Sequence, residues 1–96
     1  MAGQIRMTPD TMRIRAGEVN TQGEAVRSVI TQMTNIMGVL QDEWDGQASV
    51  AFNEQFFRLK PYFEEMEQLT HNIGRQLLET AQVVEEADAA IASKFR

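Results

Sequence analysis

The chain contains no cysteine, one histidine and one tryptophan among its 96 residues. Without cysteine it can form no disulfide, no thiolate zinc site and no cysteine nucleophile. His71 has no second histidine with which to build a usual zinc site, so the sequence predicts neither a metal nor a cofactor. No run of about 18 apolar residues occurs, and the basic N-terminal stretch is not followed by an apolar segment. We therefore expect neither a membrane span nor a Sec-type signal peptide.

Basic residues are also scarce, 9 against 14 acidic ones, which gives a net charge of -5. They are scattered along the chain rather than clustered. Binding to nucleic acid requires a positive patch that neutralises phosphates, so nucleic acid is not an expected partner. Neighbouring acids such as Glu64 and Glu65 are expected on a solvated helix face, because acid–base catalysis needs a pocket that separates two carboxyl pKa values. The sequence therefore predicts a protein that is not an enzyme.

The length allows one domain with a small core, expected to span residues 1–96. Apolar residues recur at alternating steps of three and four over two long segments, which is the period of an amphipathic helix. The first helix is expected at about 9–42, where Thr8, Pro9 and Asp10 supply a capping hydroxyl, a proline and a carboxylate. The second helix is expected at about 47–93.

One apolar stripe follows each predicted helix and marks the surface expected to pack in the core or in a dimer. Its main members are Val19, Gly23, Val26, Ile30, Met33, Phe52, Phe56, Leu59 and Phe63. Gly23 costs a helix roughly 1 kcal/mol relative to alanine, so it marks either a close helix crossing or a tolerated weak point. Pro61 removes one backbone donor, and a kink is expected near Leu59 while the heptad register continues.

The stretch 43–47 lies between the two helices and forms the expected bend of a hairpin. It holds Trp44, which is expected to cap the end of the core, and Gly46, which suits either an unusual backbone angle or a close helix start. Helices that fold back here pair outward from the bend. The second helix is longer than the first, so its residues from about 83 to 96 are expected to overhang.

The apolar stripes are wider than a single pair of helices can cover. A second hairpin would cover the remainder, and stability then depends on association. We therefore expect an all-α fold in which two helical hairpins form an antiparallel four-helix bundle. In that dimer the overhang of one copy lies beside the bend of the other, so that Trp44 meets the region from Val84 to Ile91.

The sequence Trp44-Asp45-Gly46, placed at the midpoint of two long amphipathic helices, resembles the motif of the WXG family of early-secreted-antigen-like proteins. The resemblance covers essentially the whole chain. It implies a small protein secreted by a type VII system, exported as a folded dimer. It also implies recognition of a C-terminal segment by a membrane-bound ATPase of the FtsK/SpoIIIE type.

The tail, about 84–96, holds the candidate export signal that the resemblance implies. Actinobacterial members carry Tyr-x-x-x-Asp/Glu there, whereas this chain has Val84 in place of the tyrosine and Asp88 at the expected spacing. Ile91 and Phe95 complete a hydrophobic and acidic pattern that resembles Firmicutes members. For that branch the resemblance implies a homodimer, with a paralogous WXG protein as the alternative mate.

Two other functions remain open from the sequence. An adaptor or chaperone would use the same helices to pair with the helical N-terminal domain of a larger type VII toxin and bring it to the export machinery. A membrane-active helix is the third reading, which the net charge of -5 disfavours.

Overall fold

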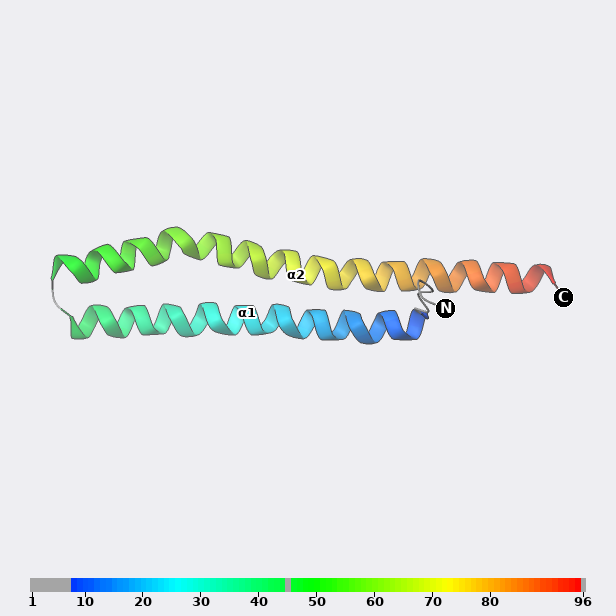
Figure 1. The fold of residues 1–96 in the computed structure, drawn as a ribbon, viewed down its shortest axis with the longest axis horizontal. Helices are drawn as coiled ribbons and strands as arrows, with labels where there is room; N and C mark the ends of the chain where they lie inside the picture. The colour runs from blue at the N-terminus through cyan, green and yellow to red at the C-terminus, as the bar shows by residue number, and fades with distance from the viewer. Residues whose placement is uncertain (1–7, 45, 96) are drawn as a thin grey trace, which may run out of the picture.

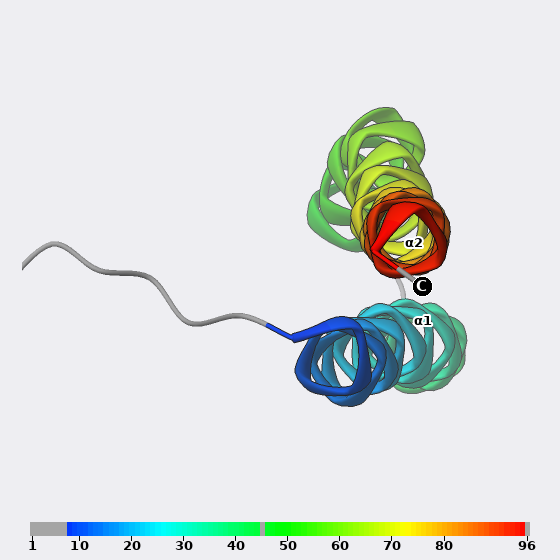
Figure 2. The same ribbon diagram turned by 90° about the vertical axis from the view of Figure 1, so that its right-hand side faces the viewer.

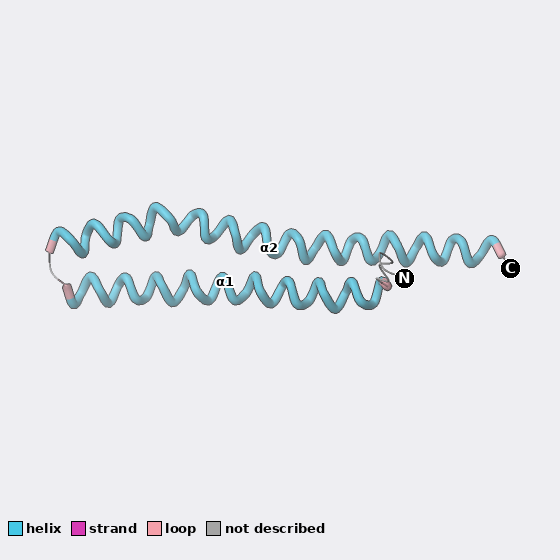
Figure 3. The backbone as a smooth tube through the Cα atoms, viewed as in Figure 1, coloured by secondary structure: helices cyan, strands magenta, loops and turns pink. Residues whose placement is uncertain are grey.

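The computed structural model describes residues 8–44 and 46–95, and these form a hairpin of two helices (Figure 1). Helix α1 is Pro9–Glu43 and helix α2 is Gln47–Lys94. Figure 3 shows only helix and short connecting loops in this part of the chain. The expected all-α helical hairpin is confirmed. Asp45 of the expected bend and Arg96 of the expected tail lie outside the described residues.

The two ends of α1 differ in how well they are capped. At its start, the Thr8 hydroxyl accepts a hydrogen bond from the backbone N–H of Thr11 at 3.1 Å, and Pro9 follows in the first turn. At its end there is no basic residue in the last turn, where Asp42 and Glu43 face the negative end of the helix dipole. The N-terminus of α1 is therefore stabilised by its cap, whereas the C-terminus at the bend lacks a favourable charge.

The bend depends on the backbone conformation of Gly46. Its φ of 150° and ψ of 173° lie in a region that is essentially restricted to glycine. A Cβ at this position would meet no atom within 4 Å, so conformation, and not crowding, requires the glycine. The next turn adds a local bond, in which the Ser49 hydroxyl donates to the Gly46 carbonyl at 3.0 Å.

We expect Gly46→Ala to lower the free energy of unfolding by about 1–3 kcal/mol, because alanine is strained at this φ. The matched control is Gly38→Ala. Gly38 also has open space around a Cβ but lies inside α1, so alanine there should stabilise the helix by up to about 1 kcal/mol. Urea denaturation followed by circular dichroism measures both. Equal effects of the two variants would contradict this role of Gly46.

The contact between the helices is small and made largely by small residues. The buried positions are Ala16, Gly23, Ile30, Ser49, Phe56, Gly74 and Ala81. At the open end of the hairpin the backbones approach closely, since a Cβ on Gly74 would lie 3.3 Å from the carbonyl oxygen of Ala16. Towards the bend, Ile30 and Phe56 occupy the contact instead. The hairpin alone therefore buries a thin core.

Helix α2 continues through Pro61 without a break. It bows away from α1 in the part drawn in green, which includes Pro61 (Figure 1). Viewed along its length, the molecule is one layer of two helices, and no other described element covers either broad face (Figure 2).

The pairing of the helices is shifted by about one turn from simple counting around the bend. Arg27 pairs with Glu67, and Arg13 still reaches Glu85, at 2.9 and 2.8 Å. The reason is that α2 begins beyond the end of α1 (Figure 1), so each α1 residue meets a later residue of α2. Contact therefore extends to Glu85, and the expectation of an overhang from about residue 83 was slightly early.

Candidate functional site

The hairpin has one apolar face, which we call the groove face and define by two adjoining grooves between α1 and α2. The first groove, of about 330 Å³, is lined by Gln22, Ala25, Val26, Val29, Ile30, Phe63 and Met66. The second, of about 220 Å³, lies nearer the bend and is lined by Met33, Met37, Leu40, Phe52, Gln55, Phe56, Leu59 and Phe63. Phe63 is common to both. An apolar surface of this extent on a small protein marks an interaction site.

The predicted stripe divides between the seam of the hairpin and the groove face. Gly23, Ile30 and Phe56 are buried between the helices. Half-buried members are Val19, Val26 and Phe63, and exposed members are Met33, Phe52 and Leu59. Each helix thus carries more apolar surface than its own partner helix covers, and the excess is displaced towards the groove face.

The opposite side, which we call the polar face, is tied by hydrogen bonds that sequence reasoning did not predict. Arg27 lies two residues from Val29, which turns it by about 200° on a helix and places it on the other flank of α1. Its guanidinium bonds the Glu67 carboxylate at 2.9 Å. This ion pair lowers the pKa of the Glu67 carboxyl below its usual value, because hydrogen bonding to Arg27 favours the charged form.

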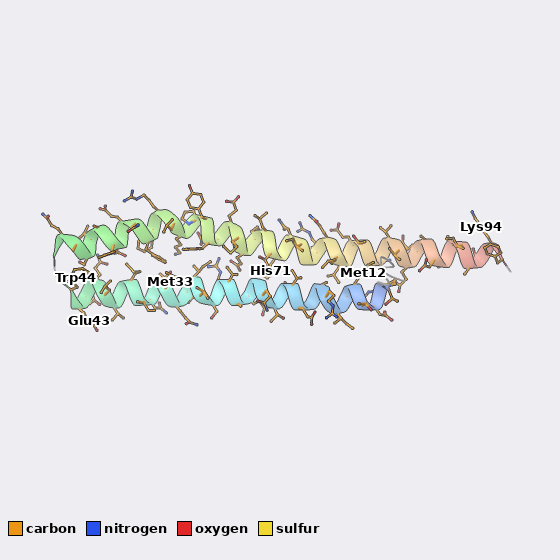
Figure 4. All side chains as sticks on the ribbon, viewed as in Figure 1. Met12, Met33, Glu43, Trp44, His71 and Lys94 are labelled. Carbon is orange, nitrogen blue, oxygen red and sulfur yellow. The ribbon has the colours of Figure 1, made fainter. Side chains whose placement is uncertain are left out.

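His71 completes the polar face and explains Gly23. Its Nδ1 lies 2.6 Å from the Asn20 side-chain oxygen, and its Nε2 is 3.6 Å from a Glu67 carboxylate oxygen. A Cβ on Gly23 would be only 2.7 Å from the imidazole ring. Of the two interpretations of Gly23, the close crossing therefore agrees with the structure. Figure 4 shows His71 between the helices, and its side chain is 31% exposed.

The bend contributes Trp44, which extends the groove face to the end of the hairpin. Its ring centroid lies 5.7 Å from that of Phe52, which lines the second groove, and the residue is 40% exposed. Figure 4 shows Trp44 beside Glu43 at this end, with Lys94 at the other. Trp44 is thus partly packed and partly open to a partner, while Gly46 is exposed and determines the chain path.

The far end of α2 projects past the start of α1 (Figure 1). Val84 is half-buried and Glu85 bonds Arg13, whereas Asp88, Ile91 and Phe95 are exposed, Phe95 by 85%. The ion pair also lowers the pKa of the Glu85 carboxyl, mainly through the hydrogen bond from Arg13. Residues 86–95, which are the last part of α2 and its C-terminal cap Phe95, extend beyond the hairpin contact, and we call them the projecting end.

Within residues 8–44 and 46–95, no three or more histidine or acidic side chains are grouped so as to hold a metal ion. In the same ranges, neither helix combines the length and the apolar composition that crossing a membrane requires.

Two long antiparallel helices joined at a Trp-x-Gly bend, with one apolar face and a projecting end, define a class of helical-hairpin proteins. The family model WXG100, described as "Proteins of 100 residues with WXG", matches residues 4–89, and the chain belongs to this family.

Relatives over the whole length come from Firmicutes, the branch that the tail pattern resembles. Protein YukE of Bacillus subtilis is 33% identical over 96 residues, which covers 100% of this chain and 99% of YukE. "Type VII secretion system extracellular protein A" of Staphylococcus aureus (strain USA300) is 32% identical over 91 residues, covering 95% and 94%. The crystal structure "Geobacillus thermodenitrificans EsxA crystal form I" has a TM-score of 0.85 and 37% identity, covering 96% and 99%.

Proposed function

We propose that this protein is a substrate of a type VII secretion system, exported as a folded homodimer and recognised by an FtsK/SpoIIIE-type ATPase through its projecting end. The observation that carries the proposal is the projecting end itself. It is a regular helix that presents Asp88, Ile91 and Phe95 outside the hairpin contact. These side chains are exposed in the single hairpin and are therefore accessible to a binding partner. The name of the S. aureus relative, an extracellular type VII protein, supports the same function.

The second part of the proposal is the partner of the groove face, which we take to be another copy of the chain. Two antiparallel hairpins that meet face to face are related by a two-fold axis lying across the helices. That axis places α1 against the partner's α1 and α2 against the partner's α2. If Phe52, against which Trp44 packs, meets the partner's Val83, the two α2 helices cross between Glu67 and Gln68.

This register can be tested for consistency against the exposed residues of α2. Residues equally distant from the crossing point become neighbours, so Met66 meets the partner's Leu69 and Tyr62 meets the partner's Ile73. These four residues, Phe52 and Val83 are all at least half exposed in the single hairpin. A single register therefore pairs apolar with apolar residues along α2, and it also brings the bend of one copy to the projecting end of the other.

Cross-linking between introduced cysteines tests this arrangement. The natural chain has no cysteine, so no native thiol reacts with the cross-linker. We expect a mixture of Trp44→Cys and Ile91→Cys chains to form a covalent dimer with a short bis-maleimide. The matched control replaces Ile91→Cys with Ile36→Cys, which lies towards the bend of its own copy and so far from the bend of the other copy, and is similarly exposed, by 61% against 56%. Cross-linking in the control but not in the first mixture would refute the register.

The adaptor interpretation predicts a different association state for the purified chain. An adaptor would fill its groove face with helices of a larger toxin, and the chain alone would then remain a folded monomer. Sedimentation analysis of the purified chain at micromolar concentration separates the two, since a stable dimer supports the homodimeric substrate.

A further inference from the structure

Three methionines line the groove face, and two of them, from opposite helices, are exposed. Met66 of α2 lines the first groove and Met33 of α1 lines the second, and they are 51% and 36% exposed in the single hairpin. Met12 differs from both, since it is half-buried and lines neither groove. Because the chain has no cysteine, thioethers are its only sulfur groups. The uncovered hairpin therefore presents two exposed thioethers on its apolar face, and the thioether of Met37 lies half-buried in the second groove.

We propose that Met33 and Met66 are sites of oxidation by peroxides, and that their sulfoxides prevent the groove face from pairing. The inference rests on the proposed homodimer. With hydrogen peroxide, a sulfur lone pair attacks one oxygen, the O–O bond breaks, and the second oxygen leaves as water while the sulfoxide forms. Sulfur loses two electrons and the peroxide gains them. A methionine sulfoxide reductase reverses the change with a thiol as reductant.

The effect on pairing follows from the chemistry of the grooves. A thioether is flexible and apolar, whereas a sulfoxide carries a hydrogen-bond acceptor. The only polar side chains that line the two grooves are Gln22 and Gln55. An acceptor buried without a donor weakens an interface by about tenfold or more. A dimer holds two copies each of Met33, Met37 and Met66 on its groove faces, and the two copies of Met66 lie near the crossing point, so complete oxidation should weaken the dimer by at least about 100-fold.

Oxidation and assembly are coupled in both directions. A dimer that covers Met33 and Met66 shields them from peroxide, whereas Met12 lies outside both grooves. The rate of oxidation at Met33 and Met66, relative to that at Met12, should therefore fall as the protein concentration rises through the dimer dissociation constant. The projecting end contains no methionine and is unaffected.

The test treats the full chain with hydrogen peroxide, locates sulfoxides by peptide mass spectrometry, and measures the dimer dissociation constant by sedimentation. Wild type is compared with the triple variant Met33→Leu/Met37→Leu/Met66→Leu, in which neither groove holds a methionine, and with the control Met12→Leu. We expect oxidised wild type and oxidised Met12→Leu to dissociate at least about 100-fold more readily, and the oxidised triple variant to remain dimeric. Circular dichroism checks that all three keep their helix content, and treatment with a sulfoxide reductase should restore wild-type pairing.

The possible failures are distinct. If untreated wild type is a monomer at about 100 µM, the homodimer proposal fails and this inference fails with it. If untreated wild type is a dimer and oxidised wild type pairs equally well, the methionine inference alone is overturned. It is also overturned if the oxidised triple variant loses its dimer to the same extent as wild type.

Discussion

A chain that ends at Glu86 is expected to fold as a helical hairpin but to remain inside the producing cell. The truncation removes Asp88, Ile91 and Phe95, which are exposed, and it keeps the pair between Arg13 and Glu85. Helicity should therefore fall only by the residues removed, whereas export should be lost almost completely. Immunoblots of medium and cell fractions measure export, and circular dichroism of the purified chain measures the fold.

A pair of single variants separates recognition from a general loss of apolar surface. Ile91→Ser removes an apolar residue from the stripe shared by Val84, Asp88 and Phe95. Val83→Ser removes a similarly exposed one, 64% against 56%, that lies outside this stripe. Export should fall strongly in the first variant and little in the second. Continued export of the truncated chain would refute the assignment of the signal to the projecting end.

The second large effect is expected at the groove face, from Val29→Glu. Each copy would bring a carboxylate into the apolar interface, where an unpaired charge is costly to bury, so the dimer should weaken by at least about 100-fold. Val39→Glu is the matched control. Val39 is on the same helix and is exposed to the same extent, 54%, but it lines neither groove.

Sedimentation equilibrium gives the dissociation constants of both variants, and thermal unfolding at high dilution reports the single hairpin. We expect the two glutamate variants to unfold alike when dilute, because Val29 and Val39 are equally exposed in the hairpin. Equal dimer constants for the two would show that the groove face is not where the second copy binds.

The helices and the bend could be predicted from the sequence because each has a local cause. The alternating three- and four-residue steps define both helices, and the capping group of Thr8 and Pro9 marks the start of α1 within one residue. The need for glycine at position 46 likewise follows from one backbone angle. These features depend on neighbours in the chain, which a sequence displays directly.

The division of the stripe and the pairing of the helices could not be predicted in the same way. Periodicity shows that Phe52 and Phe56 share an apolar face, but only the relative rotation of the helices decides that Phe56 is buried and Phe52 is exposed. Gly74 was missed because its role depends on the approach of the Ala16 carbonyl from a distant part of the chain. The contact of His71 with Gly23 has the same origin, since the two positions meet only once the register is known.

The arrangement of the molecule in a single layer has a consequence for passage through a narrow opening. The hairpin measures 76 × 26 × 16 Å along its principal axes, and the two shorter dimensions are determined by two helices lying side by side, not by the number of residues in each helix. A second hairpin stacked face to face adds one helix diameter in one direction. The width of the opening that a folded rod needs is therefore determined by how many helices lie abreast, while the length of α2 affects only how long the passage takes.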